Sequence, residues 1–375
     1  MNTLILTTAF ARAAPVMGAF LFARYLYLAN ESVVFAALDD SPSGLRNDID
    51  SSGIPAISFG LNGWRGMRKR QTVQQYVEAN GIDAVMSDGL RPDIIAAGLR
   101  GPTRVANVRG LLREHYALDY SPIKARFATW AHTRALKKLD GVFAISPEIA
   151  GHLAGLGIAP GLLRVVDNFI DVGSVKAASL SPAEHPVTPL GAGVHIGLFA
   201  ALIRRKRIDI ALRGFAGAID KLPTSDATLH IFGEGPLRSQ LVGLAGRLGV
   251  LDRVVFHGFI AQPLPLMAQM DIVLLTSDRE GVPRSFMEAM ALGRTCVSSA
   301  FPGVTSIIQE GKTGYTFEPG RHADLAVILA NLVGGVRIPP ERLHAYMLAR
   351  HDVGCCAPEM WHQIQQIAQS RCRVV

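Results

Sequence analysis

The sequence predicts an α/β protein built from two doubly wound domains, and three observations lead to that fold class. Short β-rich runs alternate with helix-like runs along almost the whole chain of 375 residues. Some of these runs are apolar on both faces, such as DIVLLT at 271–276, which is typical of parallel strands covered by helices. A chain of this length also exceeds the size at which a single core stops growing, so two compact units are expected.

Strands and helices are expected to alternate through the first half of the chain, in the rhythm of βαβ units. The clearest helix-like stretches are QTVQQYVEANG at 71–81 and IKARFATWAHTRALKKLDG at 123–141. The β-rich runs are, in order, TLILTTA, SVVFAAL, PAISF, DAVMSD, TRVANVR, GVFAIS and LRVVDNF.

The second half of the chain repeats this alternation. Its β-rich runs are VHIGLFA, ATLHIFG, RVVFHGF, DIVLLTS and RTCVSSA. Helices are expected between and after them, near 208–219, 237–248, 263–270, 285–292 and 303–309.

A stretch without periodicity separates the two halves. Residues 175–193, VKAASLSPAEHPVTPLGAG, are rich in Ala, Ser, Pro and Gly and are expected to form an interdomain linker. We therefore predict an N-terminal domain at 1–180, a C-terminal domain at 181–350 and a final helix within 351–375 that packs back on the N-terminal domain. A ligand is expected between the domains, at the carboxyl edges of their sheets.

Composition and charge narrow the class of protein. The chain is 49% hydrophobic and 18% charged, which argues against a disordered protein. Its formal net charge of +7 and its pI near 9.4 favour an anionic partner, which could be a phosphate ester, a nucleic acid or an acidic lipid surface. Charge alone does not choose among these.

The cysteines and the N-terminus bear on the compartment. Cys296, Cys355, Cys356 and Cys372 include an adjacent pair and have no metal-ligand spacing, so we expect neither a disulfide framework nor a zinc site, and a reducing compartment. The apolar N-terminus has no Lys or Arg before its apolar run, unlike a signal peptide, and no transmembrane helix is expected. We expect a cytoplasmic protein.

One stretch carries the main candidate for a binding site. In EGVPRSFMEAMALG, residues 280–293, Glu280 lies in the loop after the strand DIVLLTS, and Glu288 lies about one turn into the next helix. The N–H groups at the start of that helix favour an anion, and each carboxylate can accept hydrogen bonds from two neighbouring hydroxyls. This arrangement suits a nucleotide sugar. The alternative is a solvated loop glutamate and an acidic residue that stabilises a helix N-terminus.

The stretch resembles the Glu-x7-Glu signature of the family 4 retaining glycosyltransferases, which have the GT-B fold of two Rossmann-like domains. Further motifs follow the order found in that family, and the resemblance is strongest from about 194 to 320. These motifs are AISPEIAGHL at 144–153, VVDNFID at 165–171, FGEGPLRSQL at 232–241, VVFHGFI at 254–260 and GVTSIIQEGKTGYTFEPG at 303–320.

The resemblance implies roles for both glutamates and their neighbours. Glu280 would contact hydroxyls of the donor sugar, together with the backbone of Gly281 and Val282. Glu288 would hold the ribose of the nucleotide.

The same resemblance implies how the phosphates are held. Ser285 and Phe286 would offer backbone N–H groups to them, and Lys206, in LIRRKRIDIAL, would neutralise the diphosphate as it leaves. The alternative for Lys206 is a solvated basic turn.

The chain departs from the family pattern in three places. Ala201 stands where the family usually has an arginine, five residues before the lysine, and Ser306 stands where a glutamate is common. Phe169 replaces the usual glycine of Asn-Gly-Ile-Asp. Nearby arginines could compensate for Ala201, namely Arg204, Arg205 or Arg207.

Signals in the first half are weaker. Arg109, in NVRGLLREHY, corresponds to a position after a strand that would meet the donor phosphate or an anionic acceptor group, with Glu114 or His115 nearby. Its alternative is a surface loop arginine. SDGLRPD at 87–93 resembles an acceptor-side loop, and Gly18 would match the loop after the first strand.

The family implies a metal-independent mechanism without a protein nucleophile or base, and no cofactor beyond the donor substrate. The donor is expected to be a UDP-sugar rather than a GDP-sugar. The other glycosyltransferase fold uses an Asp-x-Asp metal site, but Asp48 and Asp50 in NDIDSSG are expected to be a solvated loop.

Basic residues in the first half suggest a membrane surface. Aromatic side chains lie among them in WRGMRKR at 64–70 and in the helix-like stretch at 123–141, as in interfacial helices. The alternative is a solvated face with Trp64, Phe127 and Trp130 in the core. Nucleic acid is not expected, because no recognised nucleic-acid module is present. The basic residues are Arg65, Arg68, Lys69, Arg70, Arg126, Arg134, Lys137 and Lys138.

The sequence thus favours a cytoplasmic glycosyltransferase, peripheral at the inner face of a membrane. It would move a hexosyl or N-acetylhexosaminyl group from a nucleotide sugar to a lipid-linked or oligosaccharide acceptor of polysaccharide or lipopolysaccharide assembly. Two alternatives stay open. One is a sugar-nucleotide epimerase of the same fold, and the other is a nucleotide-sugar-binding protein that has lost activity.

Overall fold

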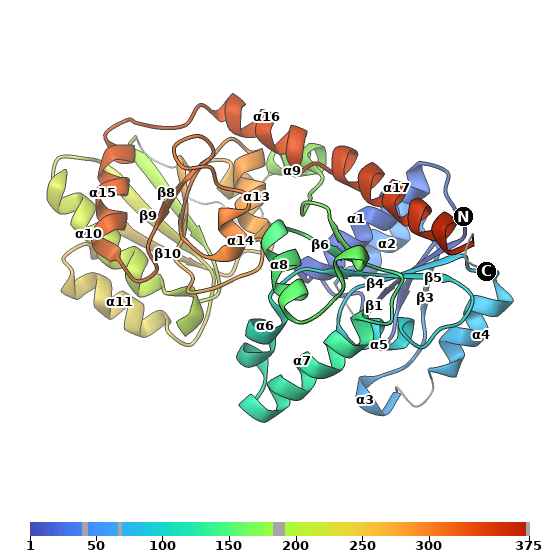
Figure 1. Ribbon diagram of the computed structural model, residues 1–375. Helices are drawn as coiled ribbons and strands as arrows, with labels where there is room; N and C mark the ends of the chain where they lie inside the picture. The colour runs from blue at the N-terminus through green and yellow to red at the C-terminus, as the bar shows by residue number, and fades with distance from the viewer. Residues whose placement is uncertain (40–43, 67–69, 183–191, 373–375) are drawn as a thin grey trace. The chain divides into compact units, whose positions relative to one another are not determined.

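The chain folds into two compact units. Unit 1 comprises Met1–Phe169 and Val353–Val375, and unit 2 comprises Ile170–Asp352 (Figure 1). The computed structural model describes residues 1–39, 44–66, 70–182 and 192–372. Within those ranges, no helix combines the length and the apolar character that a membrane span requires.

Unit 1 contains a parallel sheet in the order β3-β2-β1-β4-β5-β6-β7. Each strand falls within one of the β-rich runs expected from the sequence. The order reverses direction between β1 and β4, which is the point where doubly wound sheets bind ligands. The strands are β1 (Thr3–Thr7), β2 (Val33–Ala37), β3 (Ala56–Ser58), β4 (Ala84–Ser87), β5 (Thr103–Val108), β6 (Gly141–Ala144) and β7 (Leu163–Val165).

The helices of unit 1 cover both faces of this sheet. The expected helices at 71–81 and 123–141 are present as α4 and α7. The helices are α1 (Ala14–Leu28), α2 (Arg46–Ser52), α3 (Gly63–Gly66), α4 (Gln71–Ala79), α5 (Leu90–Ala96), α6 (Leu112–Asp119), α7 (Pro122–Leu136), α8 (Pro147–Gly155) and α17 (Val353–Cys372).

Helix α1 was not expected, and its composition explains why. The run from Phe20 to Ala23 is buried throughout, so the helix lacks the single apolar stripe by which helices are usually recognised. It packs between the sheet and α17, and Figure 1 shows α17 alongside it. The final helix therefore belongs to unit 1.

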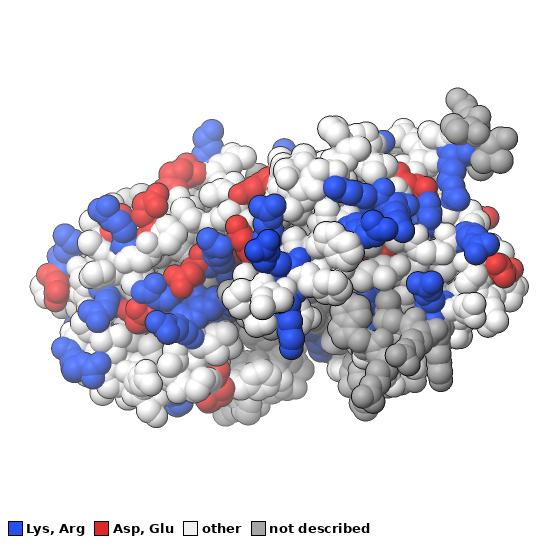
Figure 2. All heavy atoms as spheres, turned by 60° about the horizontal axis from the view of Figure 1, so that its bottom comes forward, with Lys and Arg blue, Asp and Glu red and all other residues white. Residues whose placement is uncertain are grey.

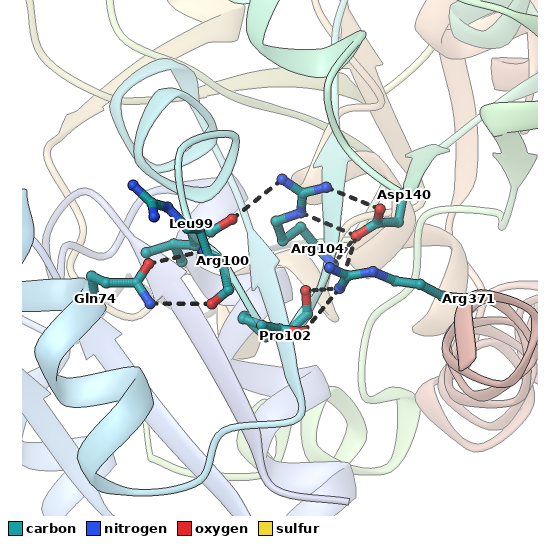
Figure 3. A network of polar contacts seen from close by, with 8 residues as sticks. Gln74, Leu99, Arg100, Pro102, Arg104, Asp140 and Arg371 are labelled. Carbon is teal, nitrogen blue, oxygen red and sulfur yellow. Dashed lines mark hydrogen bonds and ion pairs between the residues drawn. The ribbon is translucent and has the colours of Figure 1, made fainter. Parts of the chain in front are cut away.

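Hydrogen bonds and an ion pair hold α17 at its middle and at its C-terminal end. Near its middle, the Trp361 indole donates to Glu31 at 3.0 Å. In its last turn, the guanidinium of Arg371 donates to the carbonyls of Gly101 and Pro102 and lies 3.6 Å from a carboxylate oxygen of Asp140 (Figure 3). Asp140 also forms a two-point ion pair with Arg104, so the C-terminal helix is tied to the start of β5.

Unit 2 contains a second parallel sheet, in the order β10-β9-β8-β11-β12-β13. Its direction reverses between β8 and β11. Strand β13 was not expected from the sequence. The strands are β8 (Val194–Phe199), β9 (Ala227–Phe232), β10 (Val254–Gly258), β11 (Ile272–Leu275), β12 (Thr295–Ser299) and β13 (Tyr315–Phe317).

The helices of unit 2 include one that was expected to be linker. Helix α9 packs against α12 and α13, so the first unit ends at Phe169 and not near residue 180. Most of the remainder of the expected linker, residues 183–191, lies outside the described residues. The helices are α9 (Val172–Ser179), α10 (Ile208–Lys221), α11 (Arg238–Arg247), α12 (Leu264–Met267), α13 (Arg284–Ala291), α14 (Pro302–Thr305), α15 (His322–Val333) and α16 (Pro340–Arg350).

Three histidines form a hydrogen-bonded row across one side of the second sheet. His230 on β9 lies between His195 on β8 and His257 on β10, with a nitrogen-to-nitrogen distance of 3.0 Å on each side. Burial and the two neighbouring imidazoles lower the pKa of His230 to about 4. His230 is therefore neutral near pH 7.

Candidate functional site

The candidate site of unit 2 lies at the point where the strand order reverses. Two loops meet there, because β8 and β11 are parallel neighbours and their carboxyl ends reach the same edge of the sheet. One loop follows β8 and carries Lys206, and the other follows β11 and carries Glu280.

Lys206 and Glu280 form an ion pair across these loops. The ammonium group of Lys206 contacts Oε1 of Glu280, and the hydroxyl of Ser277 donates to the same oxygen. Both side chains of the ion pair are only 15% exposed. A largely buried carboxylate needs such partners, because desolvation of an unpaired charge is strongly unfavourable.

Hydroxyl groups at the end of β11 hold the two loops in register. Thr276 donates from its hydroxyl to the backbone carbonyl of Lys206 at 2.9 Å. Ser299 at the end of β12 donates to the carbonyl of Ser277. The backbone on either side of the Lys206–Glu280 pair is therefore held by hydrogen bonds from the ends of β11 and β12.

Glycines in FGEGP bring another loop against the segment that carries Lys206. A Cβ on Gly233 would lie 2.0 Å from the carbonyl oxygen of Ala200, and one on Gly235 would lie 2.5 Å from that of Leu202. The backbone of Glu234 accepts a hydrogen bond from the amide of Leu202 at 2.9 Å. Only glycine allows this close approach, which explains the motif locally.

The loop that carries Glu280 is likewise approached closely by a glycine, Gly303 of α14. A Cβ on Gly303 would lie 2.1 Å from the carbonyl oxygen of Gly281 and 2.8 Å from the amide nitrogen of Val282. Ser306, where a glutamate is usual, donates its hydroxyl to the carbonyl of Gly303 at 3.0 Å.

Helix α13 begins as expected, just after Pro283. The amide of Phe286 donates to the Pro283 carbonyl at 3.1 Å, and the Phe286 side chain is buried. In the described part of the chain, the amides of Arg284 and Ser285 have no hydrogen-bond partner. These two N–H groups are the ones at the start of α13 that a ligand could accept from.

Glu288 lies one turn into α13 and is largely buried. Its Oε1 accepts a hydrogen bond from Arg284 at 2.8 Å, and its side chain is 14% exposed. Burial raises the pKa of this carboxyl group, and the charge of Arg284 opposes the rise. Within the described chain, its second oxygen makes no hydrogen bond.

The arginines near Ala201 differ in their surroundings. Arg207 is bound to Asp209 at 3.0 Å and to Asp278 at 3.1 Å, and the hydrogen bond to Asp209 raises its pKa. Arg205 reaches the carbonyl of Arg279 at 3.4 Å. Ala201 itself is exposed.

A second group of candidate residues lies at the reversal point of the sheet in unit 1. Arg109 follows β5 directly and is not a surface loop residue, because its side chain is only 11% exposed. It donates to Asp88, which follows β4, at 2.8 Å and to Asn168 at 2.9 Å. Burial raises the pKa of Asp88 to about 6, against the charge of Arg109.

Gly18 does not lie in the loop after β1, where it was expected. It is in the second turn of α1, because the helix begins at Ala14 with Pro15 in its first turn. A Cβ on Gly18 would lie 2.2 Å from an Nη atom of Arg109. Gly18 thus provides the space that the Arg109 guanidinium occupies.

The stretch SDGLRPD is held by charged contacts inside unit 1. Arg91 is paired with Asp39 at 2.8 Å. Asp93 is fully buried and contacts His132 of α7 at 2.6 Å, and the other imidazole nitrogen contacts the Tyr116 hydroxyl at 2.6 Å. These two contacts join α5, α6 and α7.

Other residues singled out in the sequence have structural roles in unit 1. Asp48 and Asp50 lie in helix α2, not in a loop, and pair with Arg12 and Arg46. Phe169 fills the core of unit 1. Across the described ranges, no three His, Cys, Asp or Glu residues are grouped so that they could hold a metal ion.

The basic stretches are only partly described. Arg68 and Lys69, and the side chains of Trp64 and Arg65, lie outside the described residues. On α7, by contrast, Phe127 and Trp130 are 64% and 59% exposed, so they do not lie in the core.

The sequence pointed to Lys206 and Glu280 but not to the residues that position them. Thr276, Ser277 and Ser299 are buried hydroxyl residues at the carboxyl ends of two strands. Their place directly after apolar β runs was the available signal. Asn168 lies in the motif VVDNFID at 165–171, but the sequence alone assigned it no role.

Family models match both units of the chain. The model described as Glycosyltransferase Family 4 matches residues 19–174, and the model described as Glycosyl transferases group 1 matches residues 193–334. Together they span more than half of the chain. The protein therefore belongs to the glycosyltransferases that these two models define.

Relatives with assigned names match parts of the chain. It is 33% identical over 127 residues to N-acetyl-alpha-D-glucosaminyl L-malate synthase of Bacillus anthracis, covering 34% of this chain and 32% of the relative. It is 25% identical over 237 residues to lipopolysaccharide 1,6-galactosyltransferase of Escherichia coli strain K12, covering 62% and 60%. The matches thus span less than two thirds of these relatives' lengths.

Solved structures share the fold over nearly the whole chain. Anabaena Alr3699/HepE, in a structure with UDP, has a TM-score of 0.78 at 18% identity, covering 98% of this chain and 100% of that one. The lipopolysaccharide outer core galactosyltransferase WaaB has a TM-score of 0.72 at 18% identity, covering 97% and 99%. These likenesses establish the GT-B fold expected from the sequence.

Proposed function

We propose that this protein transfers a sugar from a nucleoside diphosphate sugar to a hydroxyl group of a glycolipid or polysaccharide precursor. The observation that carries the proposal is the Lys206–Glu280 pair beside the start of α13, at the reversal point of the sheet in unit 2. A cation, two amides without partners and two largely buried carboxylates at one edge match the chemistry of a nucleotide sugar.

Each of these groups has a task in the proposed reaction. Lys206 and the amide of Ser285 would contact the diphosphate, where negative charge grows as the glycosidic bond breaks. Glu280 and the backbone of Gly281 and Val282 would hold the sugar hydroxyls, and Glu288 would hold the ribose. Phe286 would contribute its amide, which now donates to Pro283 at 3.1 Å.

The proposed transfer keeps the anomeric configuration and uses no metal ion. The bond between the anomeric carbon and the diphosphate oxygen breaks, and its electrons go to the diphosphate. The acceptor oxygen bonds to the same face of the carbon, and its proton goes to the departing diphosphate. Arg109 is preorganised by Asp88 and Asn168 to meet an anionic group of donor or acceptor.

The known relatives support a particular donor and acceptor. One fold neighbour, Anabaena Alr3699/HepE, is described in a complex with UDP and in a complex with UDP-glucose, which favours a uridine nucleotide. Two relatives are named lipopolysaccharide 1,6-galactosyltransferases, which favours hexosyl transfer to a lipid-linked saccharide. We place the protein in the cytoplasm, at the inner face of the membrane.

An exposed stripe on α7 supports attachment to an anionic membrane. Ile123, Phe127 and Trp130 are 84%, 64% and 59% exposed and share one helical face by their spacing. Cations accompany them along the helix, including Lys124 and Arg126. Figure 2 shows several Lys and Arg side chains close together on the surface of unit 1. Aromatic and basic groups so mixed are typical of interfacial helices.

A second candidate function follows from Ala201. An exposed alanine in place of the usual arginine removes one positive charge from the diphosphate site. Binding of a nucleotide sugar without turnover is the function that this change favours. Incubation with donor and acceptor, followed by detection of released UDP, separates the two functions.

The site assignment is tested by thermal shift with UDP-, GDP- and ADP-sugars. A ligand that binds only the folded state at 100 times its Kd stabilises by about 2.7 kcal/mol, or about 5 °C or more in Tm for a domain of this size. We expect the UDP-sugar to give the largest shift. Glu288→Ala should abolish the shift, whereas Glu280→Ala should keep most of it and lower the transfer rate. Equal shifts and rates in all three proteins would remove the assignment.

A further inference from the structure

A pocket of about 1070 Å³ lies in unit 1, between α6, α7 and the turn after α8. Arg113 of α6 and Leu156 after α8 line it, and most of the other lining residues belong to α7. This volume is at the upper end for small-molecule sites and is large enough for a saccharide of a few rings. Helix α6 begins three residues after Arg109, so the chain leads directly from Arg109 into the helix that carries Arg113.

The charged residues of the pocket are all cations. They are Arg113, Arg126, Arg134, Lys137 and Lys138. Within the described ranges, none of them forms an ion pair with a carboxylate. Elsewhere in unit 1, Arg91, Arg104 and Arg109 each have a carboxylate within 3.0 Å. The pocket thus concentrates positive charge that an anionic ligand would balance.

The same pocket offers groups that suit a sugar. Trp130 lines the pocket and is 59% exposed, and the guanidinium carbon of Arg134 lies 5.9 Å from the centroid of its ring. Thr129 and Thr133 also line the pocket, and the buried hydroxyl of Thr133 has no hydrogen-bond partner in the described part of the structure. The Thr129 hydroxyl, by contrast, donates to the carbonyl of Ala125 at 2.9 Å.

The walls of the pocket are held in place from behind. His132 on the buried side of α7 contacts Asp93 of α5 and Tyr116 of α6, each at 2.6 Å. All three side chains are at most 5% exposed. The distance between α6 and α7 is therefore fixed before any ligand arrives, which lowers the entropy lost on binding.

We propose that this pocket binds a phosphate-bearing saccharide headgroup of the acceptor glycolipid. The role of this ligand as the acceptor rests on the proposed function, whereas the presence of the binding site does not. A phosphate fits better than a carboxylate, because it carries up to two charges and accepts the paired hydrogen bonds of several arginines at once. The exposed Ile123 and Phe127 on the outer face of α7 would lie in the membrane that holds the lipid part.

Calorimetric titration of the full chain with glucose 1-phosphate tests the proposal, with excess UDP present to occupy the donor site. Glucose and inorganic phosphate are titrated in parallel. The pocket variant is Arg126→Gln/Arg134→Gln. The control variant is Arg46→Gln/Arg100→Gln, which removes the same charge from exposed positions of unit 1 outside the pocket.

We expect glucose 1-phosphate to bind the native chain at least tenfold more tightly than glucose or phosphate alone. The pocket variant should lose at least tenfold in that affinity, and the control variant less than twofold. Equal affinities for glucose 1-phosphate and phosphate, equal losses in both variants, or no binding to the native chain would each overturn the proposal.

The outcome is independent of the proposed transfer. A pocket variant that binds glucose 1-phosphate normally, in a protein that UDP stabilises, refutes the pocket and leaves the donor site intact. If UDP does not stabilise the protein but the pocket variant loses affinity for glucose 1-phosphate, the donor site is refuted and the pocket proposal stands. In an active enzyme, the pocket variant should raise the KM for a phosphorylated acceptor about tenfold without changing that for the donor.

Discussion

Replacing Lys206 by methionine is expected to destabilise unit 2, because it leaves the carboxylate of Glu280 without its cation. Both side chains are 15% exposed, and the partner that remains is the Ser277 hydroxyl. Breaking a buried ion pair costs about 3–5 kcal/mol, and an exposed pair contributes about 0–1 kcal/mol. At 15% exposure we expect a loss of about 2 kcal/mol in the free energy of unfolding of unit 2.

A double-mutant cycle isolates this interaction. The variant Lys206→Met/Glu280→Gln has neither charge, and its amide still accepts the hydrogen bond from Ser277. It should therefore be about 2 kcal/mol more stable than the sum of the two single substitutions implies. Lys221→Met removes an exposed lysine of the same unit and serves as the control.

Hydrogen exchange is the suitable measurement of stability. The three tryptophans, Trp64, Trp130 and Trp361, all lie in unit 1, so their fluorescence does not report on unit 2. Protection of the amides in β8 and β11 reports the opening free energy of the unit that holds the ion pair.

The same substitution should weaken donor binding. A hydrogen bond to a charged group contributes about 1.5–3 kcal/mol, so the Kd for UDP should rise about 10- to 100-fold in Lys206→Met. Additive stabilities in the cycle, together with an unchanged Kd for UDP, would show that Lys206 is only part of a solvated basic turn.

Three further predictions concern other parts of the molecule. Gly18→Ala should displace the guanidinium of Arg109, because the added Cβ would lie 2.2 Å from it. The rate of sugar transfer should fall at least tenfold, while UDP still raises the Tm. An unchanged transfer rate would argue against this contact. The pKa of His230 is about 4 in the folded protein and about 6.5 in the unfolded protein, so the unfolded state binds more protons between these values. The free energy of unfolding should therefore fall by up to about 3 kcal/mol from pH 7 to pH 4. Urea unfolding should show a smaller fall in His230→Phe, and equal falls in the two proteins would exclude the histidine row as the cause. Ile123→Ser/Phe127→Ser should weaken sedimentation with vesicles containing phosphatidylglycerol at least tenfold without altering UDP binding, whereas unchanged sedimentation would exclude α7 as the membrane face.

The sequence by itself determined the order of the strands along the chain and the location of the main loops. Runs such as DIVLLTS are apolar on both faces and end in polar loops, and this local pattern is enough to identify a buried parallel strand. The start of α13 at Arg284 could be predicted for the same reason, since Pro283 acts locally.

Elements without a distinctive local pattern could not be predicted. Helix α1 is apolar over most of its surface because it is covered on both sides, so it has no stripe to recognise. Helix α9 has the composition of a linker, and only its packing on α12 and α13 assigns it to unit 2. Strand β13 depends on its pairing with β12.

The contacts within the candidate sites were decided by tertiary structure alone. Lys206 and Glu280 are 74 residues apart, and Arg109 and Asn168 are 59 residues apart, so only the parallel pairing of strands brings these groups together. The sequence identifies Gly18 only as a glycine near the first strand. Its structural role, which is to leave space for the Arg109 guanidinium, is visible only in the tertiary structure. Local sequence specifies the helices and strands that have a distinctive pattern, whereas burial against distant partners specifies which charges meet and which remain for a ligand.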